Sequence, residues 1–332
     1  MPYGELIDAG RAQLGLARPA RLRLTRLLSA VLSRRPLRRL IATLLWLYAA
    51  SGTQGLLRRF HLLGHGRLAR LESTMPRIER LRAPRVPTVV APRGSVAVFV
   101  GCIGDLAERA VADDLARLLA DCGYAADFVA AQTCCGAIDQ HAGRPARAEQ
   151  LAARNIAAFD SGDQPILPLA TGCAATLLDY PRLAPEGGKP FTKRLRDPLA
   201  FLSEHGEPLR FKPTRLKVAI HEPCTQRNVI REGDALRKLL VRIPELEIVE
   251  LDTTSTCCGA AGSHFISHPE AADALLAPKL AAAARLQPDV ILSGNIGCSL
   301  HLAAGLYRAA GQASETSPEL LHPLRLLARC RA

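Results

Sequence analysis

The sequence has few aromatic residues and no cysteine in its first 100 positions. Only 4% of its 332 residues are aromatic, and no Cys-x-x-Cys pair occurs anywhere along it. Structural zinc sites usually contain such pairs, so the second absence weighs against zinc. No apolar stretch followed by a small-residue cleavage site stands near the beginning, and ten cysteines in so large a chain do not indicate a secreted disulfide scaffold. We therefore expect the reducing cytoplasm.

Lysine is absent from residues 1–95, which nevertheless hold 18 arginines and only 4 acidic residues. This segment carries a balance of +14 in a chain whose net charge is +12, so the remainder is close to neutral. A basic segment of this kind could bind anionic lipid, nucleic acid or an acidic partner protein. No aromatic side chains interleave with the arginines as in a base-stacking surface, so we expect no nucleic acid.

Long hydrophobic runs are also missing. The apolar stretch at 40–50 has 11 residues, short of the roughly 20 needed to cross a bilayer. Any membrane contact is therefore expected to be peripheral, at the inner face, through the basic amino-terminal region. Leucines at three- and four-residue spacing predict two or three arginine-rich helices within 10–72, and three prolines predict an extended linker at 82–95.

Short β-branched and aromatic runs alternate with helical patterns from about residue 95 onward. The run VAVFV at 96–100 predicts a strand buried on both faces of a parallel sheet. Strands are predicted at 96–100, 125–130, 165–170, 216–220, 246–251 and 289–294, and helices at 105–121, 137–159, 190–205, 233–242 and 269–285. This alternation predicts two tandem α/β domains with parallel sheets, at 95–205 and 206–332, preceded by a basic α-helical region and linker at 1–94.

Eight of the ten cysteines form a repeated pattern. Each half has a lone cysteine after a predicted strand, then a Cys-Cys-Gly triplet, then a second lone cysteine after another strand. Equivalent positions in the two halves are 122, 123 and 125 residues apart. The chain therefore carries a duplicated four-thiol unit, with Cys102, Cys134, Cys135 and Cys173 in the first half and Cys224, Cys257, Cys258 and Cys298 in the second.

The predicted positions of these cysteines favour one iron–sulfur cluster in each half. They fall at the carboxyl ends of strands or at turns into helices, where parallel sheets bind ligands and helix N-termini stabilise anions. A turn closed by Gly136 can direct two adjacent thiols toward one object. A disulfide between adjacent cysteines is a poor alternative, because their Cα atoms are only about 3.8 Å apart. Four-cysteine zinc and buried unligated thiols stay open as alternatives.

Four segments resemble the iron–sulfur subunit of glycolate oxidase and, more broadly, the CCG cysteine-rich domains shared with lactate-utilisation proteins and heterodisulfide reductase. They are TCCGAIDQHAGRPARAEQLAARNIAAF at 133–159, HEPCTQRN at 221–228, TCCGAAGSHFISHPE at 256–270 and GNIGCSLHLA at 294–303. The resemblance spans about residues 95–328. It implies 4Fe–4S clusters on the eight cysteines and a non-catalytic electron-transfer role. The electrons would come from a partner subunit that carries FAD and oxidises glycolate or another 2-hydroxy acid.

The sequence departs from this family in two places. Family members begin with a ferredoxin-like domain bearing two Cys-x-x-Cys-x-x-Cys-x-x-x-Cys-Pro runs, and the residues that follow it resemble PYGELIDAGR at 2–11. We expect a separate ferredoxin as a partner, a gene start placed too late, or a loss of that domain. Thr176 and His301 stand where heterodisulfide reductase has a fifth cysteine. This favours ordinary four-cysteine clusters, with His301 as an alternative fifth ligand.

Three further residues need an interpretation. His221 precedes Cys224 by three positions and either hydrogen-bonds a cluster sulfur or satisfies backbone groups. Cys122 and Cys330 lie outside the repeat and are expected to be small buried hydrophobic residues. Two other functions are compatible with the sequence: a thiol–disulfide reductase whose cluster cleaves a disulfide, and a scaffold that has lost its redox partner.

Overall fold

The structure is a computed structural model, which describes residues 3–17, 23–60, 62, 67–75, 84–89, 93–251, 256–309 and 317–332. The amino-terminal part of these described residues holds five helices rather than the predicted two or three: α1 (Tyr3–Ala17), α2 (Arg23–Leu32), α3 (Arg35–Ala50), α4 (Thr53–Arg59) and α5 (Arg67–Ser73). The predicted linker at 82–95 lies partly outside the described residues, and 84–89 has no regular structure.

The first parallel sheet has the strand order β2-β1-β3. Its central strand is buried from Val96 to Phe99, as the continuous apolar run predicts. The strands are β1 (Gly94–Phe99), β2 (Tyr124–Asp127) and β3 (Ile166–Pro168). The helices are α6 (Cys102–Ala107), α7 (Arg109–Asp121), α8 (Ala137–His141), α9 (Pro145–Ala158), α10 (Thr171–Leu178), α11 (Tyr180–Leu183), α12 (Pro185–Lys193) and α13 (Pro198–His205).

The second sheet repeats this scheme and adds one strand, in the order β5-β4-β6-β7. All of its pairings are parallel. The strands are β4 (Lys217–Ile220), β5 (Glu247–Glu250), β6 (Val290–Leu292) and β7 (Glu319–Leu321), and a π-helical turn spans Gln226–Ile230. The helices are α14 (Gly233–Leu240), α15 (His264–Ser267), α16 (Pro269–Leu286), α17 (Ile296–Ala309) and α18 (Pro323–Arg329). The prediction of two α/β units with parallel sheets is confirmed, although the three-residue β7 was missed.

Three helices that the sequence analysis predicted as continuous are broken. The one predicted at 190–205 ends at Lys193, as α12, and resumes at Pro198, as α13. The predicted helix at 137–159 is interrupted at Gly143, whose φ of +73° is left-handed, and resumes with Pro145 in its first turn. Proline suits that position because its missing N–H has no helical partner there. The predicted helix at 105–121 begins earlier, at Cys102, and is interrupted at Glu108, whose ψ of 37° is not helical. The break at Gly143 sets the start of α9, and an equivalent proline, Pro269, starts α16.

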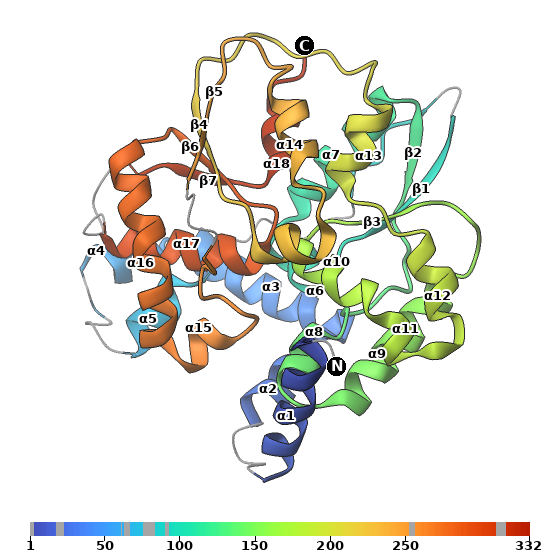
Figure 1. The fold of residues 1–332 in the computed structure, drawn as a ribbon. Helices are drawn as coiled ribbons and strands as arrows, with labels where there is room; N and C mark the ends of the chain where they lie inside the picture. Colours follow the sequence, from blue (N-terminus) through green and yellow to red (C-terminus); the bar gives the residue numbers. More distant parts are fainter. Residues whose placement is uncertain are drawn as a thin grey trace.

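The two halves pack against each other through helices that lie between the sheets. In Figure 1, α7, α13, α14 and α18 lie between the first sheet, on the right, and the second sheet, on the left. One hydrophobic core includes Val96 and Leu118 of the first half together with Val218 and Leu324 of the second. Burying each such side chain stabilises the fold by about 1.5–3 kcal/mol. The exact domain division at 205/206 stays a prediction.

The basic amino-terminal helices pack on both halves. Ser29 of α2 donates a 2.6 Å hydrogen bond to Asp139 of α8, and Arg70 of α5 pairs with Asp273 of α16. Along α3, Leu40, Leu44 and Leu47 remain exposed at helical spacing. Within the described residues, no helix combines the length and apolar character needed to span a bilayer. Peripheral membrane contact stays a prediction.

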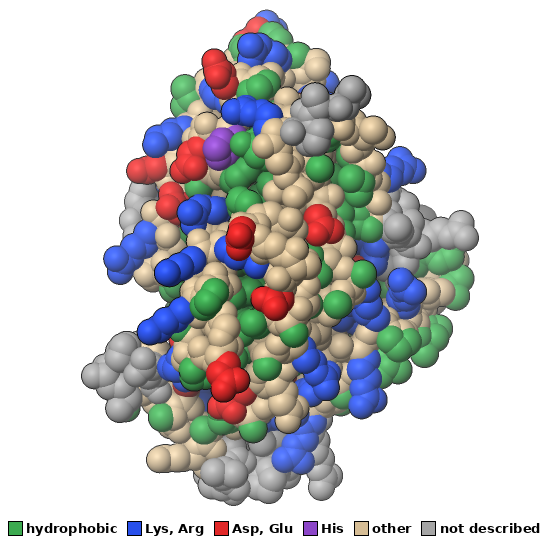
Figure 2. Space-filling model, turned by 90° about the vertical axis from the view of Figure 1, so that its right-hand side faces the viewer, with side chains coloured by type: hydrophobic (Ala, Val, Ile, Leu, Met, Phe, Trp, Pro, Cys, Tyr) green, Lys and Arg blue, Asp and Glu red, His purple; other side chains and the backbone are tan. Residues whose placement is uncertain are grey.

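The face drawn in Figure 2 shows Lys and Arg side chains scattered among hydrophobic and acidic ones. They do not merge there into one continuous basic surface. Several arginines of the amino-terminal region line a cavity instead.

Candidate functional site

The four repeated cysteines of the first half come together in one group. Cys102 is the first residue of α6, the pair Cys134 and Cys135 precedes α8, and Cys173 lies in the first turn of α10. The Sγ atoms of Cys102 and Cys134 are 3.4 Å apart. Thiol contacts then join Cys134 to Cys135 and Cys135 to Cys173. Three strand ends thus deliver four sulfurs to one place, as the sequence predicts.

The second half gathers its four repeated cysteines in the same way. Cys224 follows β4, the triplet follows β5, and Cys298 lies in the first turn of α17. The Sγ atoms of Cys258 and Cys298 are 2.9 Å apart, and thiol contacts link Cys224 to Cys257 and Cys257 to Cys258. All ten cysteines of the chain are free thiols. The duplication in the sequence is therefore a duplication of geometry.

Within each group, the first cysteine of the triplet is the thiol most ready to ionise. Hydrogen bonds from neighbouring thiols lower the pKa of Cys134 and of Cys257 well below the ordinary cysteine value. The same contacts, followed by burial, raise the pKa of Cys102 and Cys135. Each group thus concentrates its negative charge on the equivalent sulfur. Thiolates of this kind bind soft metals and iron–sulfur clusters.

Each thiol group has one buried cation beside it. Arg38 of α3 is only 4% exposed; its charge adds to the hydrogen bonds that lower the pKa of Cys134, and at Cys102 it opposes the larger effects that raise the pKa. Lys279 of α16 is 2% exposed and lowers the pKa of Cys257. A buried positive charge stabilises a group of thiolates, because the attraction is weakly screened in the protein interior. The sequence analysis missed both residues, since neither belongs to a cysteine motif.

A buried network holds the backbone of the first triplet. Asn155 of α9 donates to the carbonyl of Cys134 at 2.9 Å, and the Tyr180 hydroxyl donates to the carbonyl of Cys135 at 3.0 Å. Asn155 also donates to the Tyr180 oxygen at 2.9 Å and accepts from the Thr133 N–H at 2.8 Å. Both Asn155 and Tyr180 are completely buried. The network therefore fixes both peptide groups of the Cys-Cys pair.

The second half supports its triplet with different residues at equivalent positions. Counted from the proline that starts each helix, Lys279 of α16 corresponds to Asn155 of α9. The carbonyl of Cys258 accepts a 2.9 Å hydrogen bond from Nδ1 of His301, and Nε2 of His301 lies 3.2 Å from Asp273. With both ring nitrogens engaged in this way, His301 is not placed to be a fifth ligand. This corrects the alternative raised from the sequence.

His221 contributes to the second group more directly. One of its ring nitrogens and the Sγ atoms of Cys258 and Cys298 lie within 4.8 Å of one another, and all three residues are buried. Its Nδ1 lies 3.0 Å from the Ser293 hydroxyl, which helps to orient the ring. The structure thus brings His221 to the thiols, where the first of its two interpretations, a hydrogen bond to a cluster sulfur, requires it.

The two thiol groups belong to elements that touch. The hydroxyl of Thr225, next to Cys224, donates a 2.8 Å hydrogen bond to Thr171, two residues before Cys173. The N–H of Thr171 also donates to the carbonyl of Gly294 at 3.0 Å. These contacts join the carboxyl edges of the two sheets. The segments that carry the two thiol groups therefore pack against each other.

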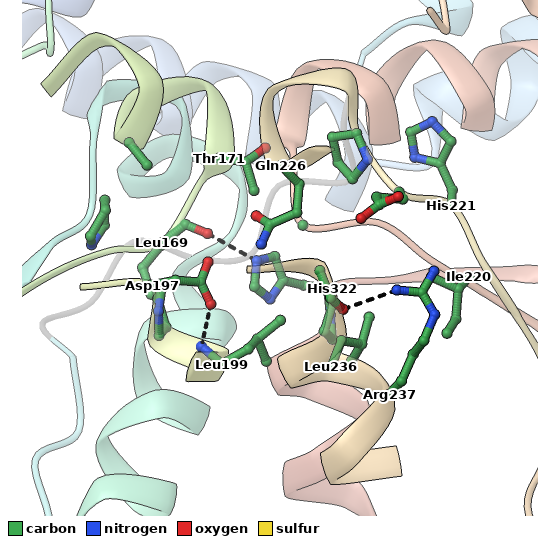
Figure 3. Close-up of a pocket in the computed structure, with 18 residues that line it drawn as sticks. Leu169, Thr171, Asp197, Leu199, Ile220, His221, Gln226, Leu236, Arg237 and His322 are labelled. Carbon is green, nitrogen blue, oxygen red and sulfur yellow. Dashed lines mark hydrogen bonds between the residues drawn. The ribbon is translucent and has the colours of Figure 1, made fainter. Parts of the chain in front are cut away.

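A small cavity of about 40 Å³ lies at this junction (Figure 3). In it, His322 donates from Nε2 to the carbonyl of Leu169 at 2.9 Å and accepts from the N–H of Leu324 at 3.2 Å. Burial lowers the pKa of His322 to about 4 and raises that of Asp197, which caps α13, to about 6. The cavity is too small for a substrate.

Cys122 and Cys330 are buried in the hydrophobic core, away from both thiol groups. Burial raises the pKa of Cys122 to about 11. This is the environment of an inert hydrophobic cysteine. Their exclusion from the predicted ligands agrees with this placement.

Comparison with known proteins gives a family and several relatives. Residues 96–178 and 218–303, together just over half of the chain, match the CCG cysteine-rich domain. The two matched segments carry the two thiol groups.

The relatives are iron–sulfur and redox proteins by name. The chain is 29% identical to the probable glycolate oxidase iron–sulfur subunit of Bacillus subtilis, over 80% of this chain and 64% of that protein. It is 32% identical to a subunit of the fumarate reductase (CoM/CoB) of Methanothermobacter marburgensis, over 64% of this chain and 42% of that protein. It is 25% identical to lactate utilization protein A of Oceanobacillus iheyensis, over 64% of this chain and 90% of that protein. The chain thus spans less than two thirds of the first two relatives.

Proposed function

The chain belongs to the CCG cysteine-rich domain family, and from this premise we propose that it is an iron–sulfur electron-transfer subunit with one cluster in each half. The observation that carries the proposal is the convergence of four buried or half-buried thiols, from three strand ends, in each of the two halves. The first cluster would be held by Cys102, Cys134, Cys135 and Cys173. The second would be held by Cys224, Cys257, Cys258 and Cys298.

The residues around the thiols fit such a group. Thiolates are the usual ligands of iron–sulfur clusters, and a four-cysteine set suits a 4Fe–4S cluster, which exchanges one electron at a time when bound. Cluster assemblies of this kind are anionic, and the buried charges of Arg38 and Lys279 offset that negative charge. The network of Asn155 and Tyr180 holds the first triplet rigid, which keeps the ligand geometry fixed.

The chain's role in a larger complex is inferred from its relatives. Glycolate and lactate, which appear in the names of two of them, are both 2-hydroxy acids. We place this chain beside a flavin-containing 2-hydroxy-acid dehydrogenase subunit, which would carry FAD and perform the oxidation. Electrons would then pass from the flavin to the clusters of this chain and on to a further carrier, for which a separate ferredoxin is a candidate.

A thiol–disulfide reductase is the competing function. One relative is named as part of a fumarate reductase with the designation CoM/CoB. Against this function for the present chain, Thr176 stands at the fifth-ligand position of the first half, and its hydroxyl donates to the carbonyl of Gly172 within its own helix at 3.2 Å. The equivalent His301 binds the carbonyl of Cys258. Neither half therefore offers a fifth thiol at that position.

Anaerobic reductive titration tests the proposed function. The purified chain should show visible thiolate-to-iron absorption that bleaches on addition of dithionite, with a paramagnetic signal from the reduced clusters. A flavin-containing glycolate or lactate dehydrogenase subunit, once reduced by its substrate, should produce the same bleaching. A colourless, zinc-containing protein with an intact fold would contradict the proposal. Turnover of a disulfide substrate without a flavin partner would favour the competing function.

A further inference from the structure

A second cavity, of about 540 Å³, lies beside the first thiol group. Its volume is within the range of roughly 300–1,000 Å³ that is usual for small-molecule sites. It is formed by the start of α3, by α6 and α7, and by the segments that follow β1 and β2. Its charged and polar lining includes Arg35, Arg38, Arg39, Asp105, Arg109 and Thr133.

The lining has a large surplus of positive charge. Four of the lining residues are arginines, whereas Asp105 is the one carboxylate among the described residues that line the cavity. Asp105 is already bound by Arg38, at 3.1 Å, and by Arg109. Among the ion pairs of the described residues, none involves Arg35 or Arg39. Within the part of the chain that the structure describes, the guanidinium groups of Arg35 and Arg39 thus form no ion pair.

The buried arginine of the cavity is held rigidly. Arg38 is 4% exposed, and besides Asp105 it donates to the carbonyl of Leu32 at 2.5 Å. Partial desolvation of its guanidinium group lowers the pKa of Arg35, Asp105 opposes this effect, and the charges of Arg38, Arg39 and Arg109 add to it. Like charges held together in this way repel one another. A bound anion would relieve that repulsion.

The arginines of α3 that line the cavity lie along one side of this helix. Arg35, Arg39 and Thr43 follow one another at four-residue spacing, and Arg38 lies beside them. The positive end of the helix dipole lies in the first turn, which holds Arg35 and Arg38. The dipole therefore adds to the attraction of these arginines for an anion.

From this geometry we propose that the cavity binds a small polyanion, a molecule with two or more carboxylate or phosphate groups. Planar guanidinium groups bind both kinds of oxyanion through paired hydrogen bonds. The cavity wall includes Gly101 and Thr133, the chain neighbours of Cys102 and Cys134. A polyanion here therefore lies close to the first thiol group and opposes the charge that Arg38 exerts on it. The proposal does not depend on the cofactor or on the redox partner.

Calorimetric titration of the full chain tests this site, with pyrophosphate and citrate as probes at constant ionic strength. We expect one of them to bind with a stoichiometry of one and to raise the thermal midpoint, whereas KCl at equal ionic strength does neither. The double variant Arg35→Gln/Arg39→Gln should bind that probe at least about tenfold more weakly. Both side chains are exposed and form no ion pair among the described residues, so the variant should fold normally.

Arg154→Gln is the matched control, because Arg154 is an exposed arginine of α9 that does not line the cavity. The affinity of this control for the probe should equal that of the unaltered chain. The phosphate and carboxylate probes separate the two possible sources of the ligand. The proposal is overturned if neither probe binds, if KCl has the same effect, or if the double variant and the control lose affinity equally. Saturable binding of an acidic ferredoxin without a response to either probe would also overturn it.

Discussion

The third residue of each Cys-Cys-Gly triplet gives a sharp prediction, because the two glycines are equivalent in sequence but not in space. Gly136 and Gly259 both have left-handed backbones, with φ of +99° and +81°. An alanine at either position would be strained by about 1–2 kcal/mol. At Gly136 the added Cβ would meet Ala148 no closer than 3.4 Å, which is ordinary contact.

At Gly259 the same methyl group would collide with α16. Its Cβ would lie 3.0 Å from the Cα of Ala272 and closer still to the carbonyl oxygen of that residue. Backbone atoms cannot rotate away, so either α16 or the triplet must shift, which adds about 1–3 kcal/mol. We therefore expect Gly259→Ala to destabilise the protein by about 2–5 kcal/mol in total, against about 1–2 kcal/mol for Gly136→Ala.

Urea unfolding and hydrogen exchange measure this difference. Gly259→Ala should lower the unfolding midpoint more than Gly136→Ala, and faster exchange should be confined to α16 and the second triplet. The second site should also lose metal, while the first retains it. Equal destabilisation by the two variants, or a larger effect at Gly136, would refute the geometric reasoning.

Three further predictions concern buried polar groups. Tyr180→Phe should lower the free energy of unfolding, measured with denaturant, by about 1–3 kcal/mol, because a buried carbonyl loses its donor. Tyr124→Phe should lower it by less, because the Tyr124 hydroxyl is half-buried. The pKa of His322 is about 4 when folded and near 6.5 when unfolded, so stability should fall by about 3 kcal/mol as the pH drops through that window. His322→Asn should remove most of this loss of stability at low pH. If the variant loses stability in the same way, the loss comes from another group. Lys279→Met should lower the reduction potential of the second centre and leave the first unchanged, as followed by spectroelectrochemistry; a shift of both would contradict the assignment.

The sequence predicted those parts of the fold that depend on local patterns. Continuous apolar runs located six strands, and the spacing of the cysteines identified both groups of thiols. β7, Glu319–Leu321, was missed because it opens on a glutamate and lacks the continuous apolar run that located β3 and β6, which are equally short. The break at Gly143 was overlooked because the helical pattern on its two sides is similar, although Pro145 marks the new start.

The supporting residues of the site could not be predicted in the same way. Asn155 and Lys279 lie about 20 residues after the triplets they serve, and their role follows from the helix packing against each triplet rather than from a motif. Arg38 reaches the first thiols from a helix that precedes the whole α/β region. The one signal for Lys279 and Asn155 in the sequence is their equal distance from Pro269 and Pro145. Comparing the two halves against each other would have found it.

The most direct test of one cluster in each half is the iron and acid-labile sulfide content of anaerobically purified cysteine variants. Cys134→Ser and Cys257→Ser should each remove about half of the iron and sulfide of the unaltered chain, and the double variant nearly all of it, since each serine removes one ligand of one four-cysteine site. Cys122→Ser, a buried cysteine outside both groups, should remove none. A folded chain without iron and sulfide, or a content that neither triplet variant changes, would contradict the presence of two cluster sites.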